Sequence, residues 1–181
     1  SATPNLDVYL YASTMTGRVY RYNGSTWTTL QPPTGTALPT TRANSLFYFN
    51  GLLYAGLQNG QVWFYDGSDW SQLDPLPTAP NTPITSVFVL GNTGFGDTVY
   101  VGTAANAGAP GLILEKDNFS NWLSIPTPAD DNTQSIRSIF FPNPNLFYAA
   151  TSATSANFKQ STNRGPWTPL ASPGNGIRSI F

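Results

Sequence analysis

The chain of 181 residues has a formal net charge of −1, and charged residues make up only 9% of it. A nucleic-acid-binding surface is therefore not expected, because affinity for phosphates needs several clustered Lys and Arg side chains. The sequence contains neither Cys nor His, which excludes disulfides, thiolate zinc sites and imidazole-based catalysis.

Aromatic residues make up 14% of the chain. So much apolar surface favours a packed fold over disorder, despite the 16 Gly and 16 Pro. No apolar run is long enough to span a membrane, and membrane insertion is not expected.

Three short signatures each recur four times along the chain. The first is an apolar residue, a Tyr and a small residue, with Tyr at 11, 54, 100 and 148. The second is a polar turn followed by Trp, at 27, 70, 122 and 167. The third is Ser-aliphatic-Phe, which begins at 45, 86, 138 and 179, and the pentapeptide Ile-Arg-Ser-Ile-Phe at 136–140 recurs at 177–181.

In chain order, the repeats cover approximately 6–33, 42–77, 84–128 and 136–173, followed by a last strand at 177–181. In the second repeat, strands are expected over 44–49, 52–57, 61–65 and 69–73, since alternating apolar residues rich in β-branched and aromatic types lie between turn signals. Asn50-Gly51, Asn59-Gly60 and Asp66-Gly67 are those turns. Each repeat therefore predicts a four-stranded antiparallel meander.

Tandem units of this length and strand number resemble the repeats of kelch and Asp-box β-propellers. The stretches 65–70 and 161–167 are similar to Asp-box turns. The resemblance covers essentially the whole chain and implies an all-β fold, a single β-propeller domain over 1–181 with four four-stranded antiparallel blades.

The signatures begin at a second strand and end at a first strand. We therefore expect the strand at 177–181 to complete the first blade and close the ring between the two termini, which leaves no free sheet edge. The alternative is a dimer in which two chains exchange terminal strands and build one ring of eight blades.

Side chains that recur in every repeat, such as the four Trp, are expected to pack between blades. Positions that diverge are the better candidates for ligand binding. Alignment of the third strands places Tyr20 with Trp63, and Arg21 with Glu115. These four residues are candidate ligand-binding residues. Trp63, which lies outside the repeated Trp positions, could either fill a packing position or form an exposed platform for a ligand.

Arginines on the first strands form a second candidate group. Arg137 and Arg178 occupy equivalent positions, where the other repeats have Asn44 and Thr85, and Arg42 lies nearby. First strands surround the propeller axis, so these guanidinium groups could bind a carboxylate, sulfate or sugar acid. The simpler alternative is that they donate hydrogen bonds to loop carbonyls.

The sequence gives little support for catalytic carboxylates or for a cation-binding site. Glu115 is the sole Glu, and most Asp residues occupy turns in which Asp bonds the local backbone, so a glycoside hydrolase is only the third hypothesis. Asp130-Asp131 could supply oxygen ligands to Ca²⁺, but no metal or cofactor is expected.

Tandem-repeat propeller lectins resemble this chain in their aromatic, Asn, Thr and Ser content and low charge. The resemblance implies a non-enzymatic, lectin-like propeller that binds neutral or mildly acidic glycans at inter-blade or channel-mouth sites. The alternative is a structural or protein-interaction module of a surface or coat assembly. Glycosylation sequons begin at Asn23 and Asn118, and a secreted location is favoured over a cytoplasmic one.

Overall fold

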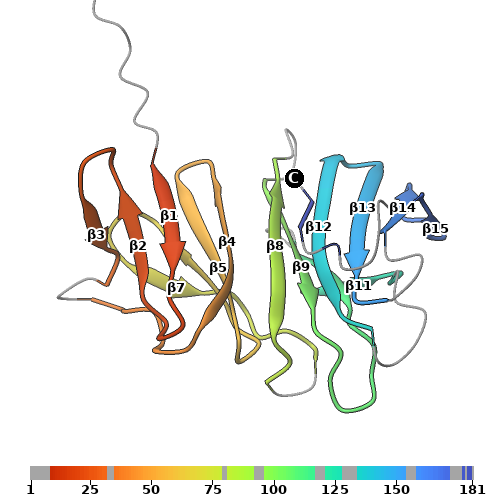
Figure 1. Ribbon diagram of the computed structural model, residues 1–181, viewed down its shortest axis with the longest axis horizontal. Coiled ribbons are helices and arrows are strands. Elements are labelled where there is room, and N and C mark those ends of the chain that lie inside the picture. The colour runs from red at the N-terminus through yellow and green to blue at the C-terminus, as the bar shows by residue number, and fades with distance from the viewer. Residues whose placement is uncertain are drawn as a thin grey trace, which may run out of the picture.

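The computed structural model describes residues 9–31, 35–78, 81–91, 96–116, 121–127, 134–153, 158–171, 177 and 179–180. Its regular elements are β-strands in four antiparallel sheets, which we call blades 1 to 4 in chain order (Figure 1). In the part of the chain described, no helix is long and apolar enough to cross a membrane.

Each blade is a meander in which consecutive strands are neighbours. Blade 1 has three strands, β1 (Leu10–Ser13), β2 (Val19–Tyr22) and β3 (Trp27–Thr29). Blade 2 has β4 (Ala43–Phe49), β5 (Leu52–Leu57), β6 (Val62–Tyr65) and β7 (Trp70–Gln72). Blade 3 has β8 (Ile84–Leu90), β9 (Thr98–Thr103), β10 (Ile113–Lys116) and β11 (Leu123–Ile125). Blade 4 has β12 (Ile136–Asn143), β13 (Leu146–Thr151), β14 (Phe158–Thr162) and β15 (Thr168–Pro169). The four strands predicted in the second repeat are confirmed.

The turn before the repeated Trp is built by a side chain. Asp66 Oδ1 accepts hydrogen bonds from the backbone N–H groups of Ser68 at 2.8 Å and Asp69 at 2.9 Å. In blade 1, Asn23 Oδ1 accepts from Ser25 and Thr26 at 3.0 and 2.9 Å. An acceptor on a short side chain replaces the missing backbone partners of a tight turn. The turn thereby fixes where the last strand of the blade, the outer strand, begins.

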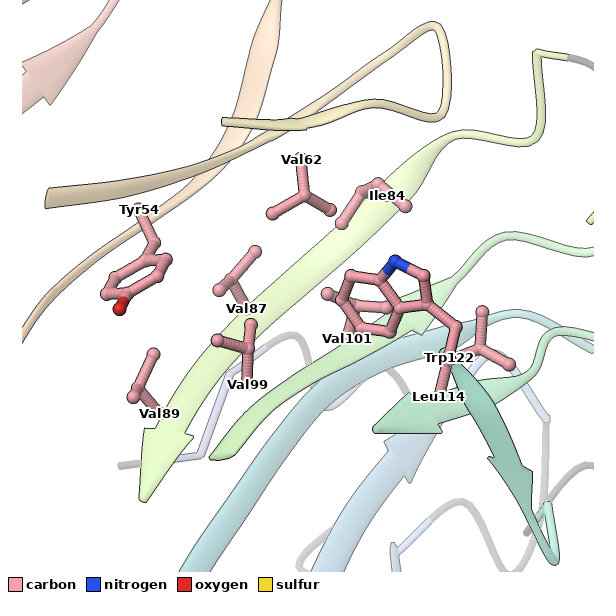
Figure 2. Packing of buried hydrophobic residues seen from close by; sticks show 9 residues of the cluster. All are labelled: Tyr54, Val62, Ile84, Val87, Val89, Val99, Val101, Leu114 and Trp122. Carbon is pink, nitrogen blue, oxygen red and sulfur yellow. The ribbon is translucent and has the colours of Figure 1, made fainter. Parts of the chain in front are cut away.

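The hydrophobic core lies between blades. Figure 2 shows the cluster in which Tyr54 and Val62 of blade 2 meet residues of blade 3 such as Val101 and Trp122. Similar clusters join blades 1 and 2 and blades 3 and 4. Blades 2 and 3, the interior blades, are therefore covered on both faces. We call the face that packs on the preceding blade the head face and the face that packs on the following blade the tail face.

The repeated tryptophans connect neighbouring blades. The indole N–H of Trp70 donates to the carbonyl of Leu30 in blade 1 at 2.6 Å, and that of Trp122 donates to Asp74 in blade 2 at 2.8 Å. Trp167 reaches Pro126 of blade 3 at 2.6 Å. The prediction that these side chains pack between blades is confirmed at these three positions.

The inner strands contain an irregularity at the same position. The pairing register of β4, β8 and β12 with the next strand shifts just after Ala43, Ile84 and Ile136. The residues skipped are Asn44, Thr85 and Arg137. Asn44 Nδ2 donates to the carbonyl of Ile84 in the next blade at 2.8 Å, and Thr85 Oγ1 donates to that of Ile136. These bulges turn a side chain toward the neighbouring inner strand.

The four blades form an open arc with blade 1 at one end and blade 4 at the other (Figure 1). Ile180 lies beside β12, where its N–H donates to Ser138 Oγ at 3.1 Å, as the N–H of Val87 donates to Ser45 Oγ at 2.9 Å. Ile180 thus takes the place of the first strand of a following blade. Pairing of this segment with β1, expected for closure within one chain, is not formed by the described residues, and blade 1 keeps three strands.

Candidate functional site

The predicted aromatic candidates lie in or beside inter-blade packing. Trp63 of β6 is half-buried against the cluster between blades 1 and 2, and its indole N–H donates to Gln61 Oε1 at 3.1 Å. Tyr20 occupies the equivalent position in β2 and is half-buried. The guanidinium of Arg21 lies over the ring of Tyr9, 4.6 Å from its centroid. Trp63 is thus largely occupied by packing.

Glu115 connects blade 3 to blade 4. Its side chain is only 8% exposed, and Oε2 lies 2.6 Å from Nη2 of Arg164, which belongs to the turn between β14 and β15. The neighbouring Tyr100 has a raised pKa, chiefly because of its burial, while Arg164 lowers and Glu115 raises it to smaller extents. This arrangement joins two blades and leaves little of the Glu115 carboxylate for a ligand.

The predicted first-strand arginines that the structure describes lie on or beside inner strands, whereas Tyr20 and Trp63 lie on third strands of the repeat. Arg42 is exposed just before β4, and Arg137 is half-buried at the bulge of β12. Arg178 lies outside the described residues, as do Asn118 and the Asp130-Asp131 pair. At the positions equivalent to Arg137, Asn44 and Thr85 donate to the carbonyls of Ile84 and Ile136 in the next inner strand.

A cleft between blades 2 and 3 brings together a different set of residues. The segment after β7 leaves blade 2 at Leu73 and Asp74 and runs toward blade 3, so its side chains border the groove between the two sheets. The cleft has a volume of about 340 Å³. Its lining combines apolar and polar side chains: Leu52, Tyr54, Phe64, Leu73, Asp74, Asp97, Val99 and Lys116.

The polar groups of this cleft are held in place by neighbouring elements. The exposed carboxylate of Asp74 lies 2.8 Å from the ammonium of Lys116, which ends β10. The indole of Trp122 fixes the backbone of Asp74 from the blade 3 side. Burial raises the pKa of Tyr54, and the negative charge of Asp97 adds to the effect. The phenol therefore stays protonated and can donate a hydrogen bond at any physiological pH.

A second hollow of about 220 Å³ adjoins Asp74. Its lining is rich in neutral hydrogen-bonding groups: Asn59, Gln61, Gln72, Thr78 and Asn81, with Pro75 and Leu76 beside them. Asp74 therefore stands where an amide-rich hollow and a partly aromatic cleft meet. No group of three acidic, His or Cys side chains suited to a metal ion occurs among the residues that the structure describes.

No sequence pattern predicts this cleft as a unit, but one signal marks two of its residues. Counting from the repeated Trp aligns Asp74 with Gln31, Pro126 and Ala171, so one blade alone has a carboxylate there. The third-strand alignment that singled out Glu115 stops one residue short of Lys116, which aligns with Tyr22, Tyr65 and Ser161. Charge at a position that is neutral in the other repeats marks both residues.

No protein-family model matches the sequence, and no curated protein is significantly similar to it. Solved structures are similar in fold. The computationally designed protein Ika8 is 11% identical and has a TM-score of 0.63, over 94% of this chain and 48% of its own. YCF48 from Cyanidioschyzon merolae is 14% identical with a TM-score of 0.60, over 93% of this chain and 61% of its own. YCF48 bound to D1 peptide is 15% identical with a TM-score of 0.58, over 92% of this chain and 54% of its own.

The chain therefore spans between 48% and 61% of the length of these structures. At such low identity the likeness bears on architecture alone. Together with the repeated antiparallel meanders, it shows that the chain is an all-β protein with the β-propeller fold.

Proposed function

We propose that the protein is a non-enzymatic binding propeller that recognises a neutral or mildly acidic glycan in the cleft between blades 2 and 3. The observation that carries this proposal is the combination, in one cleft, of the half-buried Phe64 ring with the Asp74, Asp97 and Lys116 side chains, beside the edge of the buried Tyr54 ring. Sugars present apolar C–H faces and hydroxyl groups, and a site for them needs apolar surface beside donors and acceptors.

The size and charge of the cleft support the same ligand class. A volume of about 340 Å³ is at the lower end of ligand pockets and suits one or two sugar rings. The adjoining amide-rich hollow offers neutral donors and acceptors for a further unit. Lys116 supplies a cation for a mildly acidic substituent, although the Asp74 carboxylate competes for it.

We propose binding without cleavage because, among the described carboxylates, Glu115, Asp66 and Asp74 lack the environments of an acid and base pair. Glu115 is engaged by Arg164, and Asp66 is engaged by its own turn. Asp74 is exposed and paired with Lys116, an arrangement typical of a hydrogen-bond acceptor and not of a proton-donating acid.

The proposal is tested by a glycan array followed by calorimetry with the sugars that the array identifies. The Asp74→Asn and Asp97→Asn variants should weaken binding at least tenfold, because each replaces a charged acceptor on the rim of the cleft. Asp66→Asn is the matched control, since Asp66 lies in an exposed turn. Absence of binding to every sugar at millimolar concentration, or equal loss in the control, contradicts the proposal.

The second candidate is a protein-interaction module. Exposed apolar side chains, including Met15 and Leu123, favour it, and YCF48, which shares the fold, has been solved bound to a peptide. Capture of partners from the native source separates the two functions. Elution by free sugar supports glycan binding, and a stoichiometric protein that sugar does not release supports the interaction module.

A further inference from the structure

The head face of blade 1 is exposed, although the same positions are buried in blade 2. Leu10 corresponds to Leu53, one residue before the repeated Tyr, and is 59% exposed where Leu53 is 2% exposed. Trp27 corresponds to Trp70 and is 49% exposed where Trp70 is 0% exposed. Blade 1 thus presents the packing residues of an interior blade at one end of the arc, where no described residue covers them.

The tail face of blade 4 is open at the other end. Tyr148 is half-buried, whereas its counterparts Tyr54 and Tyr100 are buried by the following blade. Phe140, Tyr148 and Phe158 stack across β12, β13 and β14 with centroid separations of 6.5 and 5.9 Å. These rings line a cleft of about 340 Å³ together with Ser179 and Ile180.

The two open faces are complementary, because tail faces and head faces pack on each other at all three junctions inside the chain. At those junctions the Trp of one blade donates to a carbonyl just after the outer strand of the preceding blade. The equivalent carbonyls of blade 4 belong to Leu170 and Ala171. They would accept from Trp27 of a blade 1 docked on this end.

The sheet edges are complementary as well. In blades 2 to 4 the strand equivalent to β1 pairs with an inner strand, whereas β1 is an edge strand of its sheet. Residues 177–181 repeat the sequence of 136–140, which pairs with β13 in blade 4. The register Ser138↔Ala150 and Ile139↔Ala149 then predicts Ser179↔Ser13 and Ile180↔Ala12 across the new junction.

We infer that a second copy of this chain covers both ends, so that two chains close one ring of eight blades through two contacts of blade 1 on blade 4. The complementarity of the two faces and of the two sheet edges supports this occupant, because a second copy supplies both partners at once. The open arc places these faces at opposite ends of one chain (Figure 1), and no strand pairing among the described residues joins them. A two-fold axis then generates both junctions and leaves no apolar end exposed.

The first test is the solution mass of the wild-type chain, measured by light scattering across the micromolar range. A closed ring has twice the 19.5 kDa mass of one chain, and this mass does not increase at higher concentration. A mass of one chain at every concentration overturns the inference. A mass that grows continuously also overturns it, because it indicates open head-to-tail filaments.

Substitutions at the two faces form the second test. Leu10→Asp should weaken dimerisation at least a hundredfold by burying a carboxylate in an apolar junction. Leu123→Asp is the matched control, because Leu123 is 53% exposed on the outer strand of an interior blade. Circular dichroism and thermal unfolding establish that each variant is folded. A dimer that resists Leu10→Asp, or that Leu123→Asp disrupts equally, overturns the inference.

A mixing experiment tests which faces meet. Leu10→Asp blocks the head face, and Tyr148→Asp blocks the tail face. Each variant alone should be monomeric, whereas a mixture should associate weakly, since one intact head face meets one intact tail face. A dimer built by two blade 1 faces would persist in the Tyr148→Asp variant and would overturn the assignment. Should Tyr148→Asp not fold, Ile180→Asp blocks the same cleft.

Discussion

Asp66 shows how one carboxylate can organise a turn. Its Oδ1 accepts from two backbone N–H groups and from the hydroxyl of Ser68. The hydrogen bonds from Asp69 and Ser68 lower the pKa of Asp66 to about 2. Asn23 makes the same backbone contacts in blade 1 without a charge, so the turn needs the acceptor oxygen and not the ionisation.

The first prediction concerns acid stability. Because the pKa of Asp66 is lower in the folded chain than in the unfolded chain, its contribution is complete above about pH 4 and is lost as the pH falls toward 2. The Asp66→Asn variant keeps the turn and should lose less stability over this window. Denaturant unfolding at several pH values measures it. Parallel pH profiles for the wild-type protein and the Asp66→Asn variant would contradict the prediction. The Asp66→Ala variant, which lacks the acceptor oxygen, should be less stable than the wild type at every pH.

The second prediction concerns the ion pair between blades 3 and 4. Arg164→Ala should destabilise the chain by about 2 kcal/mol, because the buried Glu115 carboxylate loses its cationic partner, and the half-exposed position of Arg164 limits the effect. Urea unfolding monitored by fluorescence gives the difference in free energy. The double variant Glu115→Gln, Arg164→Ala should regain part of the loss. An unchanged midpoint in Arg164→Ala would show that the pair contributes nothing.

At the scale of elements, the inner strands are joined by paired side-chain bonds. The bulged residue donates a hydrogen bond to a carbonyl of the next inner strand, as Asn44 does to Ile84. The Ser that follows the bulged residue accepts a hydrogen bond from an N–H of that same strand, as Ser45 does from Val87. The equivalent Ser86 breaks this rule. Its hydroxyl is buried and has no hydrogen-bond partner among the described residues.

The third prediction follows from this difference. Ser45→Ala removes the acceptor of the Val87 N–H and should cost about 1 kcal/mol, whereas Ser86→Ala should cost nothing or should stabilise the chain slightly. The two changes remove the same atom at equivalent places, so each is the control of the other. Thermal unfolding compares them. A larger loss in Ser86→Ala would show that its hydroxyl is bonded after all.

The strands of blade 2 could be predicted from sequence because the signals that end them are local. Asn50 and Gly51 both have positive φ, at 49° and 86°, as their turn requires. The cleft could not be predicted in the same way. It joins Asp74 after blade 2 to Lys116 at the end of β10, and only the stacking of blades brings them together.

The outcome for Trp63 has a similar cause. Alternation along β6 indicates that Trp63 and Phe64 lie on opposite faces, but both faces of an interior blade are covered. Trp63 therefore packs toward blade 1, and Phe64 packs toward blade 3. Divergence between repeats indicates exposure only where a side chain reaches a loop or a groove.

At the scale of the whole molecule, the main strand contacts between blades, among the described residues, join neighbours along the arc, so stability is approximately the sum of blade and junction contributions. Blades 2 and 3 have two junctions each, and blade 1 has one in a single chain.

The fourth prediction is that amides of β1 and β2 exchange hydrogen faster than those of β5 and β9 under dilute conditions. Raising the concentration into the range of ring formation should slow exchange at β1 and leave β5 unchanged. Hydrogen exchange measured by mass spectrometry at two concentrations tests this. Equal protection of β1 and β5 in the monomer would contradict it.

The series of inter-blade tryptophans also gives the protein an intrinsic optical probe. The indoles of Trp70 and Trp122 are buried, and their N–H groups are bonded to backbone carbonyls, whereas Trp27 is half-exposed. Indole emission moves to longer wavelength in a polar environment, so Trp27 dominates the red edge of the spectrum. A blue shift at that edge would then report the covering of blade 1 without any label.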